Sequence, residues 1–344
     1  MFKYFKWSFI VTIVGLICAY LWGEHALAGS GFKTLFVALF LSILEVTLSF
    51  DNAIINAIRL EKMPEFWRKI FLTLGIIVAV FGVRLVLPIF IVAIFSNNPM
   101  SNVINMAFND VGQYTVYLQA AHAPLVTFGG IFLGLIFFEY FLNAEKQTFW
   151  LTKIEKPLAS IGNIHYSEVI CAIILLLITI NFVHEEEKLI VLISGLAGIL
   201  TFLGINGVCE TMERFNERKA LTTAVAQMGF FNFLYLELID ASFSFDGLLG
   251  AFAISKDIII IMIGLGIGAM FVRSLTIFMV NHKTLDKYLY LEHGAHWAIG
   301  FLSLIMFISL KTEVPEWVTG TFSLLIIVIS LICSVVVKKK NINS

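Results

Sequence analysis

Residues 33–58 read KTLFVALFLSILEVTLSFDNAIINAI, an apolar segment long enough to cross a bilayer that nevertheless contains Glu45 and Asp51. The pattern returns much later in the chain as DASFSFDG, which begins at Asp240 and places Asp246 six residues further on. In both segments Ser-Phe directly precedes the second carboxylate. Carboxylates within membrane spans are costly and are usually functional. The two motifs therefore predict one functional site built from two copies of an ancestral unit.

The composition indicates an all-α, polytopic helical membrane protein that forms a single membrane domain over residues 1–344. Of the 344 residues, 59% are hydrophobic and only 14% are charged, with a mean hydropathy of +0.92, whereas soluble domains have roughly 25% charged residues. The spans must be helical because helices satisfy their own backbone hydrogen bonds. The lipid bilayer is thus the predicted partner. The absence of a basic patch with interleaved aromatic residues argues against nucleic acid, and no motif identifies a protein partner.

Apolar runs of about 17–25 residues predict about ten spans. They lie near residues 8–28, 33–58, 69–95, 125–143, 168–183, 188–209, 228–254, 257–280, 294–310 and 317–337. Lys and Arg concentrate in alternate loops, and the long loop from Ser96 to Pro124 has neither. The positive-inside rule then puts both termini in the cytoplasm, and we expect the bacterial cytoplasmic membrane. The first segment, with Lys3, Lys6 and Ala26-Leu27-Ala28, also resembles a cleavable signal peptide, and that alternative stays open.

Two parts of the chain share a plan that predicts inverted three-helix repeats. The first repeat covers residues 33–143 and the second covers residues 228–310, with connecting spans and loops over 144–227 and a last span with a basic tail over 311–344. Each repeat has a helix with two carboxylates, followed by a helix with one mid-span arginine, Arg84 or Arg273. The charge rule orients the first helices of the two repeats oppositely. Secondary transporters commonly hold their site at the interface of such repeats.

The spacing of the carboxylates bears on the shape of the helices. Six residues of α-helix turn by about 600°, so Glu45 and Asp51 point about 120° apart. Either the helices break near Ser49–Asn52 and Ser244–Gly247, or each carboxylate faces a different neighbour. Gly247 favours a break in the second repeat, and broken helices that line a cavity recur at ion sites.

The predicted site consists of hard oxygen donors with two guanidinium counter-ions. Carboxylate, amide and hydroxyl oxygens suit Mn²⁺, Mg²⁺ or Ca²⁺ better than copper or zinc. Four carboxylates and two arginines sum to a charge of −2 when all are ionised, which one divalent cation would neutralise. The alternative is that the same groups form interhelical salt bridges that only pin the bundle. The predicted metal ligands are Glu45, Asp51, Asn52, Asp240 and Asp246, with Ser49, Ser244, Arg84 and Arg273 in support.

Other motifs give weaker signals. Glu292, His293 and His296 share one face of a helix at spacings of three and four residues, which predicts either an access point for metal ions or protons or a polar helix start at the interface. Gly264 and Gly268 predict close helix packing. No Walker loop, GxSxG or HExxH motif occurs, so we expect no enzyme activity and no permanent cofactor. An intramembrane hydrolase with paired aspartates is a third alternative.

At its acidic motifs the chain resembles the TerC family of integral membrane proteins, within the LysE-like transporter grouping. The residues that carry the resemblance are Glu45, Ser49-Phe50-Asp51-Asn52-Ala53, Asp240 and Ser244-Phe245-Asp246, and it covers roughly residues 33–310. Members of that family are associated with tellurium resistance and, in several branches, with manganese export. Gly247 stands where the family often has Ser, and the long outer loop and the spans at 168–183 and 188–209 suggest a divergent branch.

The residues and the resemblance together imply a secondary transporter that exports a divalent metal cation through a carboxylate site between the inverted repeats. The residues alone imply a hard divalent cation as the transported ligand, and the resemblance implies manganese. The alternative is a TerC-like membrane scaffold or assembly factor, linked to metal or tellurium resistance, that transports nothing itself.

Overall fold

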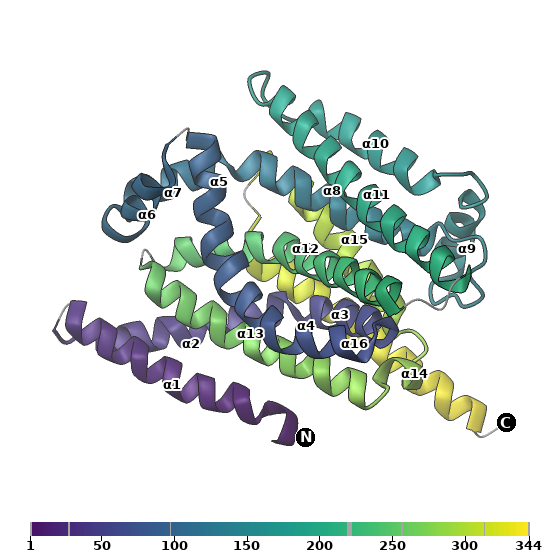
Figure 1. Cartoon of the computed structure of the whole chain (residues 1–344), viewed down its shortest axis with the longest axis horizontal. Helices are drawn as coiled ribbons and strands as arrows, with labels where there is room; N and C mark the ends of the chain where they lie inside the picture. Colours follow the sequence, from purple (N-terminus) through teal and green to yellow (C-terminus); the bar gives the residue numbers. More distant parts are fainter. Residues whose placement is uncertain are drawn as a thin grey trace.

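The computed structural model describes residues 2–26, 28–96, 98–218, 222–255, 257–312 and 314–342, and every regular element within these ranges is a helix. Most of the long helices run in a similar direction (Figure 1). This confirms the prediction of an all-α membrane protein. The elements are α1 (Phe2–Ala26), α2 (Gly31–Leu48), α3 (Phe50–Lys62), α4 (Glu65–Ile77), η1 (Val78–Val86), α5 (Leu87–Ser96), α6 (Met100–Asn109), α7 (Val111–Ala120), α8 (His122–Phe141), α9 (Thr152–Ile161), α10 (Ser167–Ile180), α11 (Lys188–Arg218), α12 (Thr222–Ile254), α13 (Ile258–Asn281), α14 (Thr284–Lys287), α15 (Leu291–Ser309) and α16 (Glu316–Ile342).

Fewer helices than the predicted ten can cross a membrane. In the described part of the chain, seven are long and apolar enough, and the segments Glu65–Gly75 and Val80–Ile94 add an eighth if they cross together despite a bend of 50°. The other two predicted spans fall short for different reasons. α10 has only 14 residues, which is less than a bilayer requires, whereas α12 has 33 residues but contains three acidic residues from Glu237 to Asp246. The seven helices are Lys3–His25, Gly31–Leu48, His122–Phe141, Lys188–Val208, Ile258–Asn281, Leu291–Ser309 and Val318–Lys339.

The two predicted repeats are in direct contact. α12 and α13 of the second repeat pack against α2, α3 and η1 of the first, and the third helices of the repeats, α8 and α15, pack on each other. The connecting helices α9, α10 and α11 all contact α8. The acidic motifs are therefore carried to a shared interface in the middle of the bundle.

The first acidic motif lies on an interrupted helix, whereas the second lies on a continuous one. α2 ends at Leu48 and α3 begins at Phe50, and Ser49 between them has φ −100° and ψ 16°. The break predicted for the second repeat, at Ser244–Gly247, is wrong because α12 continues to Ile254. Gly247 instead faces α2: a Cβ on it would lie 3.4 Å from a Leu48 methyl carbon, at ordinary contact distance.

Arg84 lies on an irregular helix. η1 is a π-helix between α4 and α5, within the region where the chain bends by 50°. π-helical turns are rare and often mark functional sites. The residue that the sequence singles out as a mid-span counter-ion is therefore carried by a segment without regular α-helical hydrogen bonding.

The predicted close packing at Gly264 and Gly268 is confirmed, and it joins α13 to α2. A Cβ on Gly264 would lie 2.6 Å from Leu41 Cβ, and one on Gly268 would lie 2.5 Å from Glu45 Cβ. Neither distance is tolerated without movement of a helix. The small residues thus hold the second repeat against the helix that carries Glu45.

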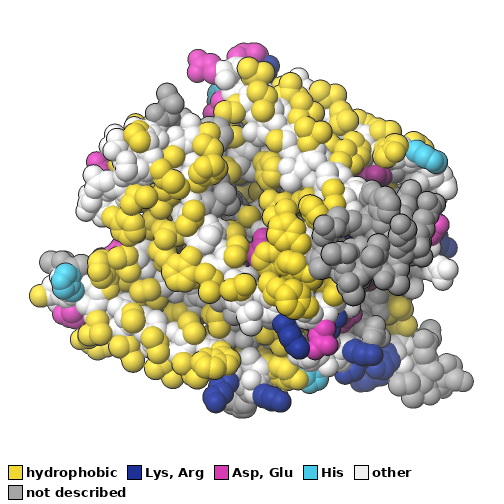
Figure 2. All heavy atoms as spheres, in the orientation of Figure 1, with side chains coloured by type: hydrophobic (Ala, Val, Ile, Leu, Met, Phe, Trp, Pro, Cys, Tyr) yellow, Lys and Arg dark blue, Asp and Glu magenta, His cyan; other side chains and the backbone are white. Residues whose placement is uncertain are grey.

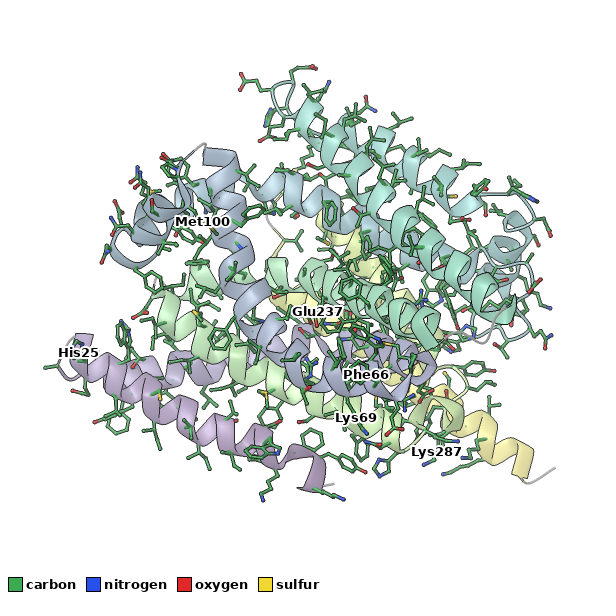
Figure 3. The ribbon with its side chains drawn as sticks, in the orientation of Figure 1. His25, Phe66, Lys69, Met100, Glu237 and Lys287 are labelled. Carbon is green, nitrogen blue, oxygen red and sulfur yellow. The ribbon has the colours of Figure 1, made fainter. Side chains whose placement is uncertain are left out.

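The outer surface is suited to lipid. Figure 2 shows a broad face covered by hydrophobic side chains, with most of the visible lysine and arginine side chains along its lower side. Large exposed patches of this kind mark interaction surfaces, and here they fit the acyl chains of a bilayer. In Figure 3, His25 and Met100 lie toward the left-hand ends of the helices, whereas Lys69 and Lys287 lie toward the opposite ends.

Candidate functional site

Arg84 joins the corresponding carboxylates of the two motifs. Its Nη2 donates a hydrogen bond to Glu45 Oε1, and its Nη1 lies 3.6 Å from Asp240 Oδ2. All three side chains are buried, with 3% or less of Glu45 and Arg84 exposed and 9% of Asp240. The three residues come from α2, η1 and α12, so the arrangement connects both repeats. The structure thus brings these three predicted site residues together.

Asn52 and Ser49 complete the hydrogen bonds of this cluster. Asn52 Nδ2 donates to Asp240 Oδ1 at 2.7 Å, and Ser49 Oγ donates to Glu45 Oε1 at 2.8 Å. Glu45 lies on α2 and Asn52 on α3, on either side of Ser49. The same region therefore supplies groups to both carboxylates of the Arg84 bridge.

Several buried oxygens of the two acidic motifs accept no hydrogen bond within the described part of the chain. They include Asp51 Oδ2, Asn52 Oδ1, Asp240 Oδ2 and Ser244 Oγ, and the exposed fraction of each of these residues does not exceed 9%. Asp51 Oδ1, by contrast, accepts from the backbone N–H of Asn52 at 2.9 Å. Burial of a polar atom without a partner is costly. A cation that binds to these oxygens would remove that cost.

The position of Asp246 is only partly described. The residue lies on α12, but its side chain lies outside the described residues. Among the residues that are described, no three His, Cys, Asp or Glu side chains form a group that can hold a metal ion. Glu45, Asn52 and Asp240 of the predicted ligand set thus meet around Arg84, whereas the hydrogen bond that the Asp51 carboxylate accepts comes from the backbone N–H of Asn52.

Arg273 does not join the Arg84 bridge but lines a small cavity beside it. The cavity has a volume of about 20 Å³, and its polar lining comes from Asn56, Arg84, Glu237, Asp240, Arg273 and Thr276. The guanidinium carbon of Arg273 lies 4.4 Å from the centre of the Phe71 ring. Among the described residues, neither Arg273 Nε nor Nη2 has a hydrogen-bond partner.

Glu237 is a buried carboxylate that the sequence analysis missed. Figure 3 shows it in the interior of the bundle, and 7% of it is exposed. A Cβ on Gly75 would lie 2.7 Å from Glu237 Oε1 and 2.6 Å from Arg273 Nη2, so this glycine leaves room for both groups beside α4. The spacing held a signal: Glu237 precedes Asp240 by three residues, and residues three apart share a helical face.

The predicted cluster of Glu292, His293 and His296 is divided between different partners. His293 Nδ1 lies 2.9 Å from Glu155 Oε2, and its Nε2 lies 3.3 Å from Thr148 Oγ1. His296 Nδ1 bonds to the backbone oxygen of Glu292 at 2.8 Å, and its ring stacks on Tyr140. These contacts join α15 to α8, to α9 and to the segment between them, and they favour the structural alternative for the cluster.

Glu155, a second missed carboxylate, ties α9 to α15. It accepts hydrogen bonds from His293 and from Trp297 Nε1, the latter at 3.0 Å, and from the backbone N–H groups of Trp150 and Leu151. Burial by itself raises the pKa of Glu155, but these hydrogen bonds outweigh burial and lower it to about 2. Burial lowers the pKa of the neighbouring Lys146 to about 8, although the negative charges of Glu155 and Glu292 act to raise it.

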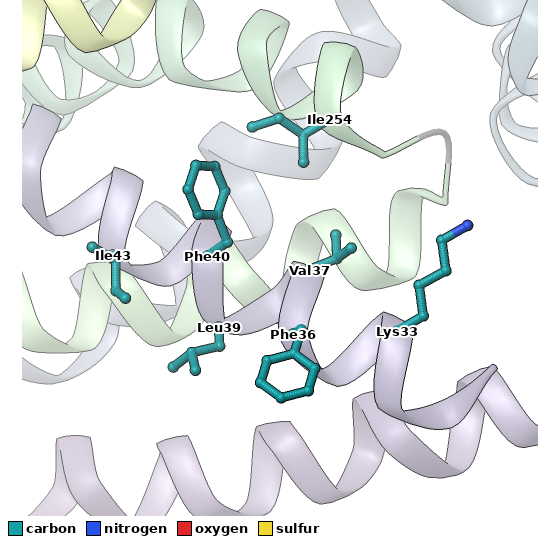
Figure 4. A pocket seen from close by; sticks show the side chains of 7 residues that line it. All are labelled: Lys33, Phe36, Val37, Leu39, Phe40, Ile43 and Ile254. Atoms are coloured by element: carbon teal, nitrogen blue, oxygen red, sulfur yellow. The ribbon is translucent and has the colours of Figure 1, made fainter.

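A larger groove lies away from the charged cluster. It has a volume of about 490 Å³ and runs along the outer side of α2 up to Ile254 (Figure 4). Its lining is apolar except for Lys33, which makes it suitable for an acyl chain and unsuitable for an ion. The residues of the groove are Lys33, Phe36, Val37, Leu39, Phe40, Ile43 and Ile254.

Comparison with known proteins identifies a family but no characterised relative. No curated protein and no solved structure matches the chain. One family model matches residues 50–341, a range that includes Asp51, Arg84 and the whole second motif but begins after Glu45. Because this match covers most of the chain, the protein belongs to the family described as Protein of unknown function (DUF475).

Proposed function

We propose that this protein is a secondary transporter that exports a divalent metal cation through the site between its two repeats. The observation that carries the proposal is that buried oxygens without hydrogen-bond donors in the described structure, Asn52 Oδ1 and Asp240 Oδ2, belong to residues of the Glu45–Arg84–Asp240 cluster. Carboxylate and amide oxygens at a repeat interface suit a hard cation. The interrupted helix at Ser49 and the π-helix η1 resemble the irregular segments found at ion sites.

Glu237 changes the charge balance that the motifs alone suggest. With it, five carboxylates and two arginines sum to −3 when all are ionised, so one divalent cation leaves −1 rather than a neutral cluster. An excess of negative charge in a membrane interior favours cation binding. The remaining negative charge can be neutralised by a proton, and we propose a proton as the ion that drives export.

Manganese is the cargo that we propose. The oxygen donors fit Mn²⁺, Mg²⁺ and Ca²⁺ alike, and the resemblance of the motifs to the TerC family favours Mn²⁺ among them. We further propose a bacterial cytoplasmic membrane with both termini inside, because Lys69 and Lys287 lie at the helix ends opposite His25 and Met100 (Figure 3).

Manganese efflux from cells that express the protein tests this function. Asp51→Asn and Asp240→Asn each remove one ionised oxygen ligand, a loss worth about 1.5–3 kcal/mol, and we expect efflux at least about tenfold slower than in the wild type. Glu186→Gln, a change at an exposed loop glutamate, serves as the control. Unchanged efflux and unchanged manganese tolerance in both site variants would contradict the proposal.

A membrane scaffold is the second candidate, and the ion pairs themselves favour it. The Arg84 bridge and the Asn52–Asp240 hydrogen bond hold α2, α3, η1 and α12 together, and loss of one partner of a buried ion pair costs about 3–5 kcal/mol. A scaffold predicts that Asp240→Asn lowers the amount of protein in the membrane and that neither the wild type nor the variant exports manganese. Quantifying the protein alongside the flux separates the two functions.

A further inference from the structure

We infer that Arg84 is a movable internal counter-cation: the transported metal ion takes its place between Glu45 and Asp240, and Glu237 receives the displaced guanidinium. This inference rests on the proposed function and specifies how the same site becomes free for its cargo. It assigns to Glu237 the role of a positioning residue that acts through Arg84.

The guanidinium of Arg84 occupies the place where a cation shared by the repeats would bind. Glu45 and Asp240 hold the same position in the two motifs, six residues before the second carboxylate. Arg84 pairs with both of them. Two positive charges at one place repel strongly in a low-dielectric interior. A metal ion therefore binds both carboxylates only after Arg84 has moved.

Glu237 offers a neighbouring carboxylate that can accept this guanidinium. Both of its oxygens are buried and accept no hydrogen bond from the described residues, and it lines the same cavity as Arg84 and Asp240. The cavity of about 20 Å³ has space for about one water molecule. Because Arg84 already lines this cavity, its head group reaches Glu237 by a local shift rather than by a large movement of the helix.

The difference between the repeats supports this role. Glu237 lies three residues before Asp240, and the residue three before Glu45 is Ser42, whose hydroxyl donates to the backbone oxygen of Leu39 at 2.7 Å. The extra carboxylate is thus absent from the first repeat and is not explained by duplication of an ion site. It occurs on the helix that faces η1, where Arg84 lies.

The energetics favour an exchange of partners over a simple displacement. A buried arginine that loses its carboxylate partners is strongly destabilising, because its charge is then left uncompensated in a low-dielectric interior. With Glu237 as acceptor, Arg84 keeps a charged partner in both positions. The π-helical turn and the bend at η1 provide an element in which such a local shift does not break a regular helix.

Mn²⁺ binding to the purified full-length protein in lipid nanodiscs tests the inference. Titrations compare the wild type, Glu237→Gln, Arg84→Gln and the double variant, with Glu186→Gln as a control for loss of a glutamate. We expect Glu237→Gln to weaken binding about tenfold or more when Arg84 is present and less than about threefold in the Arg84→Gln background. Arg84→Gln alone is expected to tighten binding. Such coupling between two residues is what a double-mutant cycle measures.

The outcomes separate this inference from the proposed function. Equal weakening in both backgrounds would make Glu237 a direct ligand, and no weakening would leave it without a role; either result overturns the inference while Mn²⁺ binding stands. Absence of Mn²⁺ binding and efflux in the wild type would overturn both. If Glu237→Gln does not fold, structures of the wild type with and without Mn²⁺ decide, because a guanidinium that remains between Glu45 and Asp240 contradicts the exchange.

Discussion

Gly247 is a second point, besides the Asn52–Asp240 hydrogen bond, at which the second motif approaches the first. A Cβ on it would lie 3.7 Å from Glu45 Oε2 and 3.4 Å from a Leu48 methyl carbon, so a small side chain fits without movement. Gly247→Ser would place a hydroxyl beside Glu45, and we expect Mn²⁺ to bind a few-fold more tightly, within the 0.5–1.5 kcal/mol of about one hydrogen bond. The measurement is the dissociation constant. Gly247→Ala is the matched control, and equal affinities for Ser and Ala would contradict the prediction.

At the scale of residues, the sequence predicts which side chains surround Arg84 but not the surroundings of Arg273. Glu45, Asp240, Arg84 and Asn52 meet as predicted, because two matching acidic motifs have few ways to be buried. Arg273 does not mirror Arg84, since Glu237 occurs in only one repeat and gives this arginine a different neighbour. The repeated motifs themselves do not reveal this asymmetry. The position of Glu237, one helical turn before Asp240, does indicate it.

At the scale of elements, the Glu155 carboxylate ties α9 to α15. The pKa of Glu155 is lowered to about 2 in the folded protein from an ordinary 4.5, so its stabilising effect is complete above about pH 4.5 and is lost as the pH falls toward 2. Glu155→Gln should lower the free energy of unfolding at neutral pH by about 1–3 kcal/mol.

Melting temperatures of the detergent-solubilised protein between pH 7 and pH 3 test this attachment. The difference between the wild type and Glu155→Gln should be constant down to about pH 4.5 and should shrink below it. Glu186→Gln, at an exposed position, should show no such trend. A difference that stays the same at every pH would mean that the ionised carboxylate does not hold α9.

The sequence predicts some elements and not others for identifiable reasons. The carboxylate spacing allowed a break near Ser49, and there the chain departs from the helix. In the second repeat Gly247 suggested a break that does not form, because glycine costs only about 1 kcal/mol within a helix and here faces α2. η1 was not predictable, since Val78–Val86 is a mostly apolar run whose residues would also suit an α-helix.

At the scale of the whole molecule, the number of membrane crossings determines whether the two termini lie on the same side of the membrane. An even number of crossings puts both termini on one side of the membrane, and an odd number separates them. We predict that both are cytoplasmic, which agrees with eight crossings, the bent pair Glu65–Gly75 and Val80–Ile94 included, and with the charge distribution.

Reporter fusions at the two termini test this orientation. A C-terminal fluorescent protein should fold and an alkaline phosphatase fusion there should be inactive, with the same pattern at the N-terminus. Activity of the phosphatase at one end only would show an odd number of crossings. In that case one of the two remaining predicted spans, the short α10 or the acidic α12, would also cross the membrane.

The π-helix η1 also has a geometrical consequence for α5. Each residue of an α-helix advances the side-chain direction by about 100°, and a π-turn, with its wider hydrogen-bonded ring, advances it by less. The angular phase of α5 is therefore offset from that of α4. A helical wheel carried across η1 is out of phase for Ile89 and Val92, which belong to a buried cluster shared with residues of α6 and α7. The length of η1, more than the identity of its residues, therefore determines which side of α5 is buried while Arg84 points into the bundle.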